Sequence, residues 1–334
     1  MSRIVAAIAL VLLAAASSSA EDAVVLRGNR RIPGLRITRD DARGVAAQVV
    51  RSPDTTLDWP RHEVVRVEYG ETPAEYAVAL KLFERASYDR ALAMFDRALE
   101  RPHAPLLKQY LLFDRARCAA AAGDHAAAAE DYAALRAQGT RTRFVFDAAR
   151  ALVERRIASK RLAEAGRVAD GISGVTKEEQ EFLGALLAEA HGAFPAARRA
   201  FARVASKGGP LRADAALGEA RCLLAMRRGA DAERVAVSLL DADAPDDLVA
   251  RAYLIIGDAR KAAASDRAGI EKALFAYLRI PALYPGDERT EARALRASAL
   301  CMREAYGPAG EARAQTLIAM LKRKYPGSAF AKGM

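Results

Sequence analysis

The sequence has few of the residues on which disulfide frameworks and metal sites depend. Its 334 residues include three cysteines and four histidines. Cys118, Cys222 and Cys301 cannot all pair within one chain, no C-x-x-C occurs, and the histidines lack metal-ligand spacing. These absences exclude a disulfide scaffold and the usual zinc motifs, so we expect no metal and no cofactor. Each cysteine lies in an alanine-rich run, which predicts a small buried thiol.

Catalytic motifs are missing as well. The sequence contains no G-x-S-x-G, no H-E-x-x-H and no phosphate-binding loop. The segment 171–177 has glycines and a lysine without that loop's spacing, and it is expected to link two helical hairpins. Acidic pairs such as Asp246-Asp247 stand at expected helix starts, where carboxylates favour the helix dipole. We therefore expect a protein that is not an enzyme, with an unrecognised hydrolase as the least favoured alternative.

Aromatic residues make up only 6% of the chain, and alanine dominates the apolar share. Such a core suits closely packed helices better than a thick sandwich of sheets. The formal net charge is +10, with acidic residues interspersed and no block of five or six basic residues. The arginines could attract anionic envelope polymers or lipid headgroups. They could equally be good helix formers on solvated faces.

The first residues, MSRIVAAIALVLLAAASSSAED, have the features of an export signal. Arg3 is followed by an apolar run from Ile4 to Ala16, and Ser18 and Ala20 are small residues at the −3 and −1 cleavage positions. The run is shorter than the roughly 20 apolar residues of a spanning helix, although an uncut membrane anchor is the alternative. No cysteine lies near the cut, which argues against a lipoprotein. We predict a signal peptide over 1–20 and a periplasmic or secreted mature protein.

Residues 22–71 have the pattern of short strands. Apolar or alternating runs recur at intervals of about ten residues with turn chemistry between them, which is typical of a small antiparallel barrel. The runs are Val24–Leu26, Ile32–Ile37, Gly44–Val50, Thr55–Trp59 and His62–Tyr69. Together, VVLRGNRRIPG, GV and VVRVEYG resemble the SH3-like or Sm-like barrels found at the start of exported bacterial repeat proteins. Trp59, the only tryptophan, is expected in core or interdomain packing.

From Pro73 onward the chain has the pattern of a helical repeat. Tyr88, Ala91, Phe95 and Ala98 begin a spacing that recurs at intervals of roughly 35 residues, most clearly up to Phe201. Small residues would let paired helix axes approach to about 8–10 Å, and the large ring would fill the space beside the next pair. One hairpin cannot bury its own apolar face, so neighbouring hairpins must stack.

This arrangement resembles the tetratricopeptide repeat (TPR). Ala79, Ala91, Phe95 and Ala98 occupy its small and aromatic positions in the first unit, and Ala116, Ala128 and Tyr132 do so in the second. Two later units lead to Tyr-Pro-Gly-Asp at 284–287 and Tyr-Pro-Gly-Ser at 325–328. These units are similar to repeats of the periplasmic coordinator of the Tol–Pal system and of outer-membrane assembly lipoproteins, which are non-catalytic envelope scaffolds.

The fold expected is thus mainly α. A small SH3/Sm-like β-barrel over 22–71 precedes a TPR-like α-solenoid over 73–330. We predict about seven helical hairpins, at 73–104, 105–140, 142–173, 176–207, 210–243, 245–286 and 288–330.

The TPR resemblance also implies a groove lined by the first helix of each hairpin. The ninth position of that helix often faces the groove, and a few neighbouring side chains would join it. The predicted partner-binding residues are Tyr110, Phe113, Arg117, Arg150, Glu154, Arg221, Asp258 and Arg303, with Leu80 and Leu186 at equivalent positions. Arginine and aromatic side chains there could clamp an extended peptide, or they could simply be solvated side chains over apolar packing.

The function expected is an exported scaffold that binds another envelope protein or peptide. The alternative is a binder of anionic glycan or lipid headgroups, with peripheral membrane or polymer contact. Nucleic acid is not expected as a partner. The identity of the partner and the oligomeric state stay open.

Overall fold

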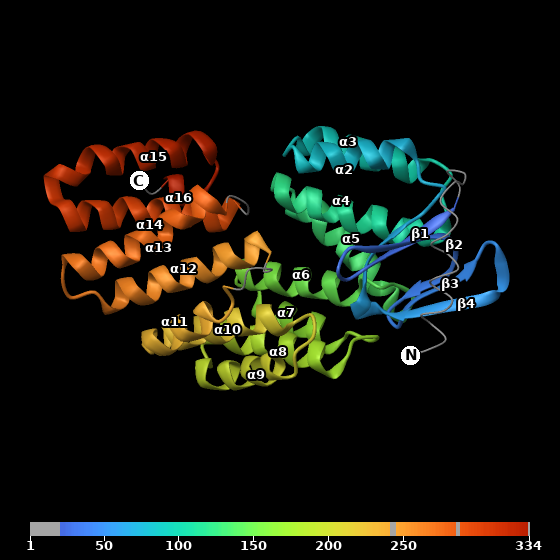
Figure 1. Cartoon of the computed structure of the whole chain (residues 1–334), viewed down its shortest axis with the longest axis horizontal. Helices are drawn as coiled ribbons and strands as arrows, with labels where there is room; N and C mark the ends of the chain where they lie inside the picture. The colour runs from blue at the N-terminus through green and yellow to red at the C-terminus, as the bar shows by residue number, and fades with distance from the viewer. Residues whose placement is uncertain (1–20, 241–244, 285–287, 333–334) are drawn as a thin grey trace. The chain divides into compact units, whose positions relative to one another are not determined.

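The computed structural model describes residues 21–240, 245–284 and 288–332 (Figure 1). The predicted signal peptide at 1–20 and the turn at 285–287 lie outside the described residues. The chain forms two compact units, Met1–Leu183 and Gly184–Met334, and the division falls within α8 (Lys177–Ala190). The domain division at 22–71 and 73–330 stays a prediction, although strands give way to helices between residues 68 and 74.

The first unit begins with one antiparallel sheet. Its five strands follow the order β4-β3-β2-β1-β5. The long strand β2 serves both halves of the sheet, because Leu35 lies opposite Asp22 of β1 and also opposite Val49 of β3. The strands are β1 (Asp22–Leu26), β2 (Arg30–Asp41), β3 (Gly44–Val49), β4 (Ser52–Pro60) and β5 (Val64–Glu68), with the short helix η1 (Arg61–Glu63) between the last two.

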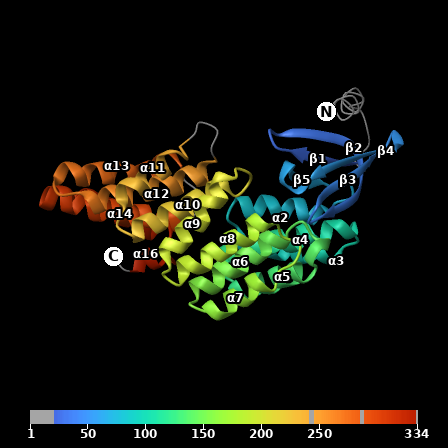
Figure 2. The same cartoon turned by 90° about the horizontal axis from the view of Figure 1, so that it is seen from below.

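The prediction of a closed barrel is wrong. Strands β4 and β5 are the two edges of the sheet, and no ladder joins them among the residues that the structure describes. The apolar face of the sheet is buried instead against the first helices, in one cluster that contains Trp59, Tyr76 and Phe95 (Figure 2). Pro53 and Pro60 stand at the ends of β4, where proline protects an edge from pairing. The expected packing role of Trp59 is confirmed.

The described residues after the sheet contain seven consecutive pairs of helices, one in each predicted interval. The pairs of the first unit are α2 (Ala74–Glu84) with α3 (Tyr88–Glu100), α4 (Lys108–Ala122) with α5 (His125–Ala137), and α6 (Val145–Ala158) with α7 (Leu162–Asp170). The next pairs are α8 with α9 (Phe194–Ser206), α10 (Arg212–Ala225) with α11 (Gly229–Val237), α12 (Asp246–Ala263) with α13 (Arg267–Leu283), and α14 (Glu288–Tyr306) with α15 (Glu311–Lys324). The short helix α16 (Ala329–Lys332) follows.

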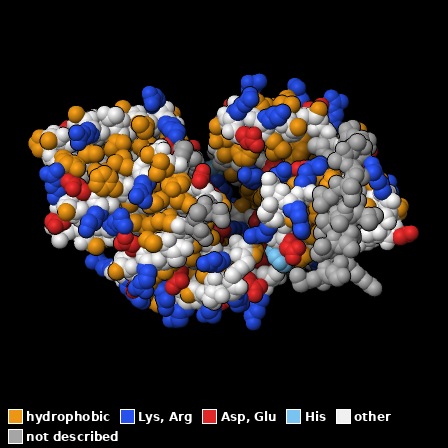
Figure 3. Space-filling model, in the orientation of Figure 1, with side chains coloured by type: hydrophobic (Ala, Val, Ile, Leu, Met, Phe, Trp, Pro, Cys, Tyr) orange, Lys and Arg blue, Asp and Glu red, His pale blue; other side chains and the backbone are white. Residues whose placement is uncertain are grey.

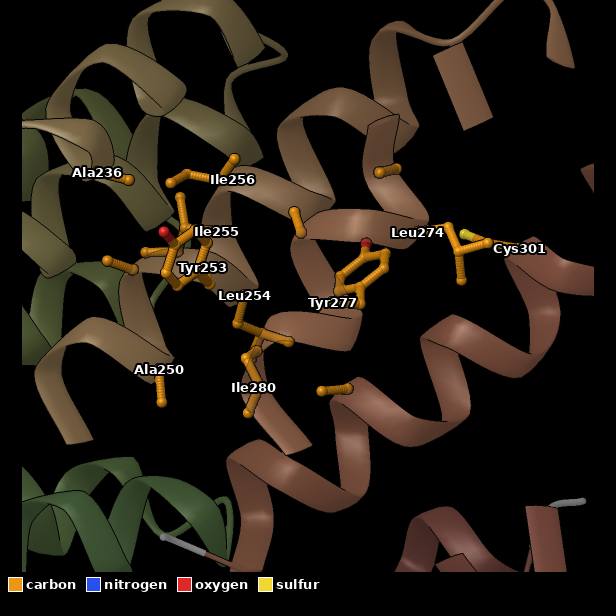
Figure 4. Close-up of a cluster of buried hydrophobic side chains, with 14 of the residues drawn as sticks. Ala236, Ala250, Tyr253, Leu254, Ile255, Ile256, Leu274, Tyr277, Ile280 and Cys301 are labelled. Carbon is orange, nitrogen blue, oxygen red and sulfur yellow. The ribbon is translucent and has the colours of Figure 1, made fainter. Parts of the chain in front are cut away.

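Small residues lie where rings pack, as the alternation of alanine and aromatic residues predicts. Ala91, Phe95 and Ala98 are completely buried. In the second unit, a Cβ atom added to Gly257 would lie 2.4 Å from the ring of Tyr277. Figure 4 shows this ring beside Leu274 in the buried cluster. Glycine thus lets α12 and α13 approach more closely than alanine would allow.

In several hairpins, the turn between the two helices uses a left-handed residue. Gly123 and Gly192 have φ angles of 86° and 77° there, which glycine adopts without strain. Ala86, Lys160 and Arg227 occupy comparable turns with φ angles of 55°, 59° and 58°. A residue with a Cβ atom pays about 1–2 kcal/mol to adopt the left-handed conformation. The backbone at Ala86, Lys160 and Arg227 is therefore strained.

The three cysteines are unpaired and buried, as predicted. Burial raises the pKa of Cys118 and Cys301 to about 11 and that of Cys222 to about 12. The thiols are therefore protonated at neutral pH and poor nucleophiles. Of the helices that the structure describes, none combines the length and the apolar character needed to cross a membrane.

Candidate functional site

The predicted groove residues belong to both units. Tyr110, Phe113 and Arg117 lie on α4, and Arg150 and Glu154 lie on α6, all in the first unit. The other three lie in the second unit, with Arg221 on α10, Asp258 on α12 and Arg303 on α14.

In the first unit, side chains from α2, from α4 and from the N-cap of α6 form what we call the aromatic strip: Phe83, Phe113, Arg117 and Phe144. Phe113 stacks on Phe144 with ring centroids 4.2 Å apart and planes 13° apart. The guanidinium carbon of Arg117 lies 5.4 Å from the centroid of Phe83 and 6.0 Å from that of Phe113. The three rings are half-buried. The strip thus offers solvent a row of rings with one cation among them.

Arg117 is held in the strip by a carboxylate on its own helix. Its Nη1 donates to Oδ1 of Asp114 at 3.1 Å, and Oδ2 of Asp114 accepts from the Tyr76 hydroxyl at 2.6 Å. Burial raises the pKa of Asp114. The Nε and Nη2 atoms of Arg117 make no hydrogen bond to any residue that the structure describes, and 51% of the side chain is exposed. One edge of the guanidinium therefore faces solvent.

Arg150 and Glu154 contact each other. The Arg150 Nε donates to Oε1 of Glu154 at 2.9 Å, and its guanidinium carbon lies 5.0 Å from the centroid of the Phe182 ring on α8. Arg150 thus connects α6 to the first-unit part of α8 while remaining partly exposed.

Tyr110 lies elsewhere, in a buried polar cluster between sheet and helices that we call the junction network: Asp40, Tyr69, Gln109, Tyr110, Thr142 and Arg143. The hydroxyls of Tyr69 and Tyr110 donate to Oδ2 of Asp40 at 3.0 and 2.7 Å. Arg143 donates to the Tyr110 hydroxyl at 3.0 Å and to the Val64 carbonyl at 2.8 Å. Tyr110 is therefore placed to join the sheet to α4 rather than to meet a partner.

Further bonds extend the junction network. The Gln109 side chain donates to the Asp40 carbonyl at 2.9 Å, and Thr142 donates to Gln109 at 2.8 Å. Arg143 lies 3.7 Å from the Asp40 carboxylate, which opposes the rise in the pKa of Asp40 that burial causes. Strands β2 and β5 are thereby tied to α4 and to the segment before α6.

In the second unit, the predicted groove residues already form hydrogen bonds with neighbouring side chains. Arg221 donates through Nε and Nη2 to the two carboxylate oxygens of Glu189, at 2.7 Å each. Arg303 makes the same double contact with Glu311, at 3.0 and 2.9 Å. Asp258 accepts from the Tyr277 hydroxyl and from Arg293, and burial raises its pKa. These side chains brace one helix against another.

Two residues of the strip were not anticipated. Phe83 lies one helical turn after Leu80, and Phe144 lies at the N-cap of α6, where a repeat pattern assigns no binding role. Phe83 could have been identified from the sequence, because its spacing from Leu80 places both residues on one face of the same helix. Among the described residues, no group of histidine, cysteine and acidic side chains is placed to hold a metal ion.

On the face shown in Figure 3, lysine and arginine side chains are scattered among acidic and hydrophobic ones. Independently of this view, Arg221 and Arg303 each have a carboxylate beside the guanidinium. No single basic surface therefore stands out on that face.

No protein-family model matches the sequence, and no curated protein matches it. Among solved structures, a tetratricopeptide repeat protein from Parabacteroides merdae is similar over 67% of this chain and 82% of that chain, with a TM-score of 0.52 and 17% identity. The C-terminal part of a TPR repeat-containing protein from Cytophaga hutchinsonii is similar over 77% of this chain and 98% of that chain, at 14% identity. The TM-score of that comparison is 0.38. The first comparison shows that the matched part of this chain has the tetratricopeptide repeat fold.

Proposed function

We propose that this protein is a non-catalytic scaffold whose aromatic strip binds an extended segment of another protein. The observation that carries this proposal is the row of half-buried rings around Arg117. Aromatic side chains bury about 150–250 Å² each when fully covered, so a partner that covers these rings gains binding energy. The stacked rings are also held in place before binding, which lowers the entropy lost on association.

The first unit is favoured over the second as the binding site, because the groups of its aromatic strip have fewer hydrogen-bond partners within the protein. Arg221 and Arg303 already have a carboxylate across the guanidinium, and Asp258 has two donors. A ligand would have to displace these contacts. At the strip, a ligand would add contacts without removing any.

We further propose that the protein is exported and acts in the cell envelope. The support is the charged start, the apolar run and the small residues of 1–20. The repeats that lead to Tyr-Pro-Gly favour the scaffold type seen in the Tol–Pal coordinator and the assembly lipoproteins. N-terminal sequencing of protein from cell fractions tests this, with a mature start at Glu21 in the periplasm or medium as the expected result.

The binding of anionic polymers is the less favoured function, because many of the arginines are neutralised by adjacent carboxylates. Polymer binding through exposed charges would weaken steeply with added salt, whereas peptide binding at the strip would weaken less. The salt dependence of binding therefore separates the two functions.

Selection of short random peptides displayed on phage tests the scaffold function. We expect enriched peptides to bind Phe83→Ser about thirtyfold more weakly than wild type, the equivalent of roughly 2 kcal/mol for one hot-spot ring. Phe275→Ser is the matched control, because Phe275 is 60% exposed on α13 in the second unit. Thermal unfolding of both variants checks that the fold is kept. Peptides that bind Phe83→Ser as well as wild type would contradict the proposal.

A further inference from the structure

Three arginines that the repeat pattern treats alike differ in how their side chains are used. Arg221 and Arg303 each direct the Nε and Nη2 edge to a carboxylate on another helix. This edge is the one that binds a carboxylate with two parallel hydrogen bonds. In Arg117 the same edge has no hydrogen bond to any residue within the described ranges. Arg117 is therefore the member of the three with an edge available to a ligand.

The neighbouring carboxylate cannot readily take that edge. Asp114 is on the same helix as Arg117, and its Oδ2 is already bound to the Tyr76 hydroxyl at 2.6 Å. Only Oδ1 reaches the guanidinium, and it meets Nη1. Turning Asp114 toward Nε would leave the buried Tyr76 hydroxyl without its partner, which is costly.

The rings hold the guanidinium in one place. Its carbon lies within about 6 Å of two ring centroids, the range of a cation–π contact. A free arginine side chain has about 2 kcal/mol of rotamer entropy to lose on binding, and this packing has already removed part of it. A planar donor fork presented beside half-buried rings is complementary to a carboxylate next to an aromatic group.

We propose that Arg117 is the specificity-determining residue of the aromatic strip and binds a side-chain carboxylate of the partner. The partner segment then carries an aromatic residue beside that acidic residue, packed against Phe113. The inference rests on the proposed function and adds the chemistry of the partner: an acidic and aromatic peptide segment. The overall basic charge of the chain also favours an acidic partner.

The test uses two small probes, N-acetyl-aspartyl-phenylalanine amide and N-acetyl-asparaginyl-phenylalanine amide. In the full chain labelled with ¹⁵N-arginine, the Nε–H signal of Arg117 is assigned by its loss in Arg117→Lys. We expect the aspartyl probe to shift this signal and to leave those of Arg221 and Arg303 in place. The asparaginyl probe should bind about tenfold more weakly, because a neutral amide replaces a charge-assisted acceptor.

Arg117→Lys keeps the charge and removes the planar fork, so it should lose most of the preference for the aspartyl probe. Arg221→Lys is the matched control and should keep that preference. Equal binding of both probes, or an unchanged preference in Arg117→Lys, would overturn the carboxylate assignment while the peptide selection could still support the strip. If neither probe shifts Arg117, the assignment also fails, and the Phe83→Ser comparison decides the scaffold function independently.

Discussion

The two compact units use the same helical hairpin but stabilise it differently. The first unit buries charge: Asp40 and Arg143 lie inside a polar network between sheet and helices. The second unit buries mainly alanine, glycine and rings, as around Gly257 and Tyr277, and its ion pairs of Arg221 and Arg303 lie at the surface, although the buried Glu291 pairs with the exposed Lys324. A buried charge whose partner is removed is strongly destabilising, whereas exposed pairs contribute little. Buried polar side chains therefore contribute more to the interior of the first unit, and the close fit of small residues against rings contributes more to that of the second.

The largest expected effect tests the buried charge of the first unit. Arg143→Met keeps most of the side-chain volume but removes the cation beside the buried Asp40 and the hydrogen bonds to the Tyr110 hydroxyl and the Val64 carbonyl. We expect it to lower the free energy of unfolding by about 3–5 kcal/mol, measured by urea denaturation. Arg303→Met in the second unit removes an exposed pair and should leave the midpoint nearly unchanged. Equal effects of the two substitutions would erase the distinction between the units.

The next effect tests the ring packing of the second unit. Gly257→Ala should lower the free energy of unfolding by about 1–3 kcal/mol through overpacking against Tyr277, despite the better helix propensity of alanine. Gly184→Ala in α8 is the matched control, because no atom lies within 4 Å of its added Cβ. That control should stabilise the protein by up to about 1 kcal/mol. Calorimetry or urea denaturation distinguishes the expected destabilisation by Gly257→Ala from the expected stabilisation by Gly184→Ala. Stabilisation by Gly257→Ala would refute the overpacking against Tyr277.

Smaller effects are expected at the turns within hairpins, which occur in both units. Lys160→Gly in the first unit and Arg227→Gly in the second should each stabilise by roughly 0.5–1 kcal/mol, because glycine relieves the left-handed strain but adds unfolded-state entropy. Gly123→Ala should destabilise by a similar amount, since only its φ angle opposes a side chain. A gain from Gly123→Ala would contradict the strain assigned to these turns.

The smallest effect is one of pH. Burial raises the pKa of Asp258 above 3.8, so the folded state binds the proton more tightly there and loses stability as pH rises through that window. Asparagine does not titrate, so the free energy of unfolding of Asp258→Asn should rise relative to that of wild type as the pH increases above 3.8, measured by urea denaturation. The hydrogen bond from Arg228 lowers the pKa of Asp231, so Asp231→Asn is the opposite control: its free energy of unfolding should fall relative to that of wild type as the pH rises from below 3.8 up to 3.8.

The sequence predicted the helical part well, because its signals are local. Ala91, Phe95 and Ala98 lie within two turns of one helix, and their spacing alone indicates which side is buried. The open sheet was not predicted, since strand patterns do not reveal whether helices will cover the apolar face. Tyr110 was assigned to the groove, yet its partner Asp40 lies 70 residues earlier on a strand, and no local pattern reports such a contact.

The aromatic strip illustrates the same limit. Arg117 and Arg221 are equivalent in the repeat pattern, and their difference arises from Tyr76 and Glu189, which lie on other helices. Phe144 joins the strip from a helix cap through a stacking contact that periodicity cannot encode. Sequence patterns can therefore nominate positions on a helix face, while the neighbouring helices decide which of them remain available.

The shared core of sheet and first helices has a consequence for how such a chain can be rearranged by recombination. Trp59, Tyr76 and Phe95 belong to one buried cluster, and Arg143 reaches across to the carbonyl of Val64. A gene fragment that begins at Pro73 would encode helices with an uncovered apolar flank and an arginine stranded in it. Recombination is thus expected to transfer the strands together with the adjoining hairpins as one unit. Later hairpins could be duplicated or lost with a smaller loss of stability.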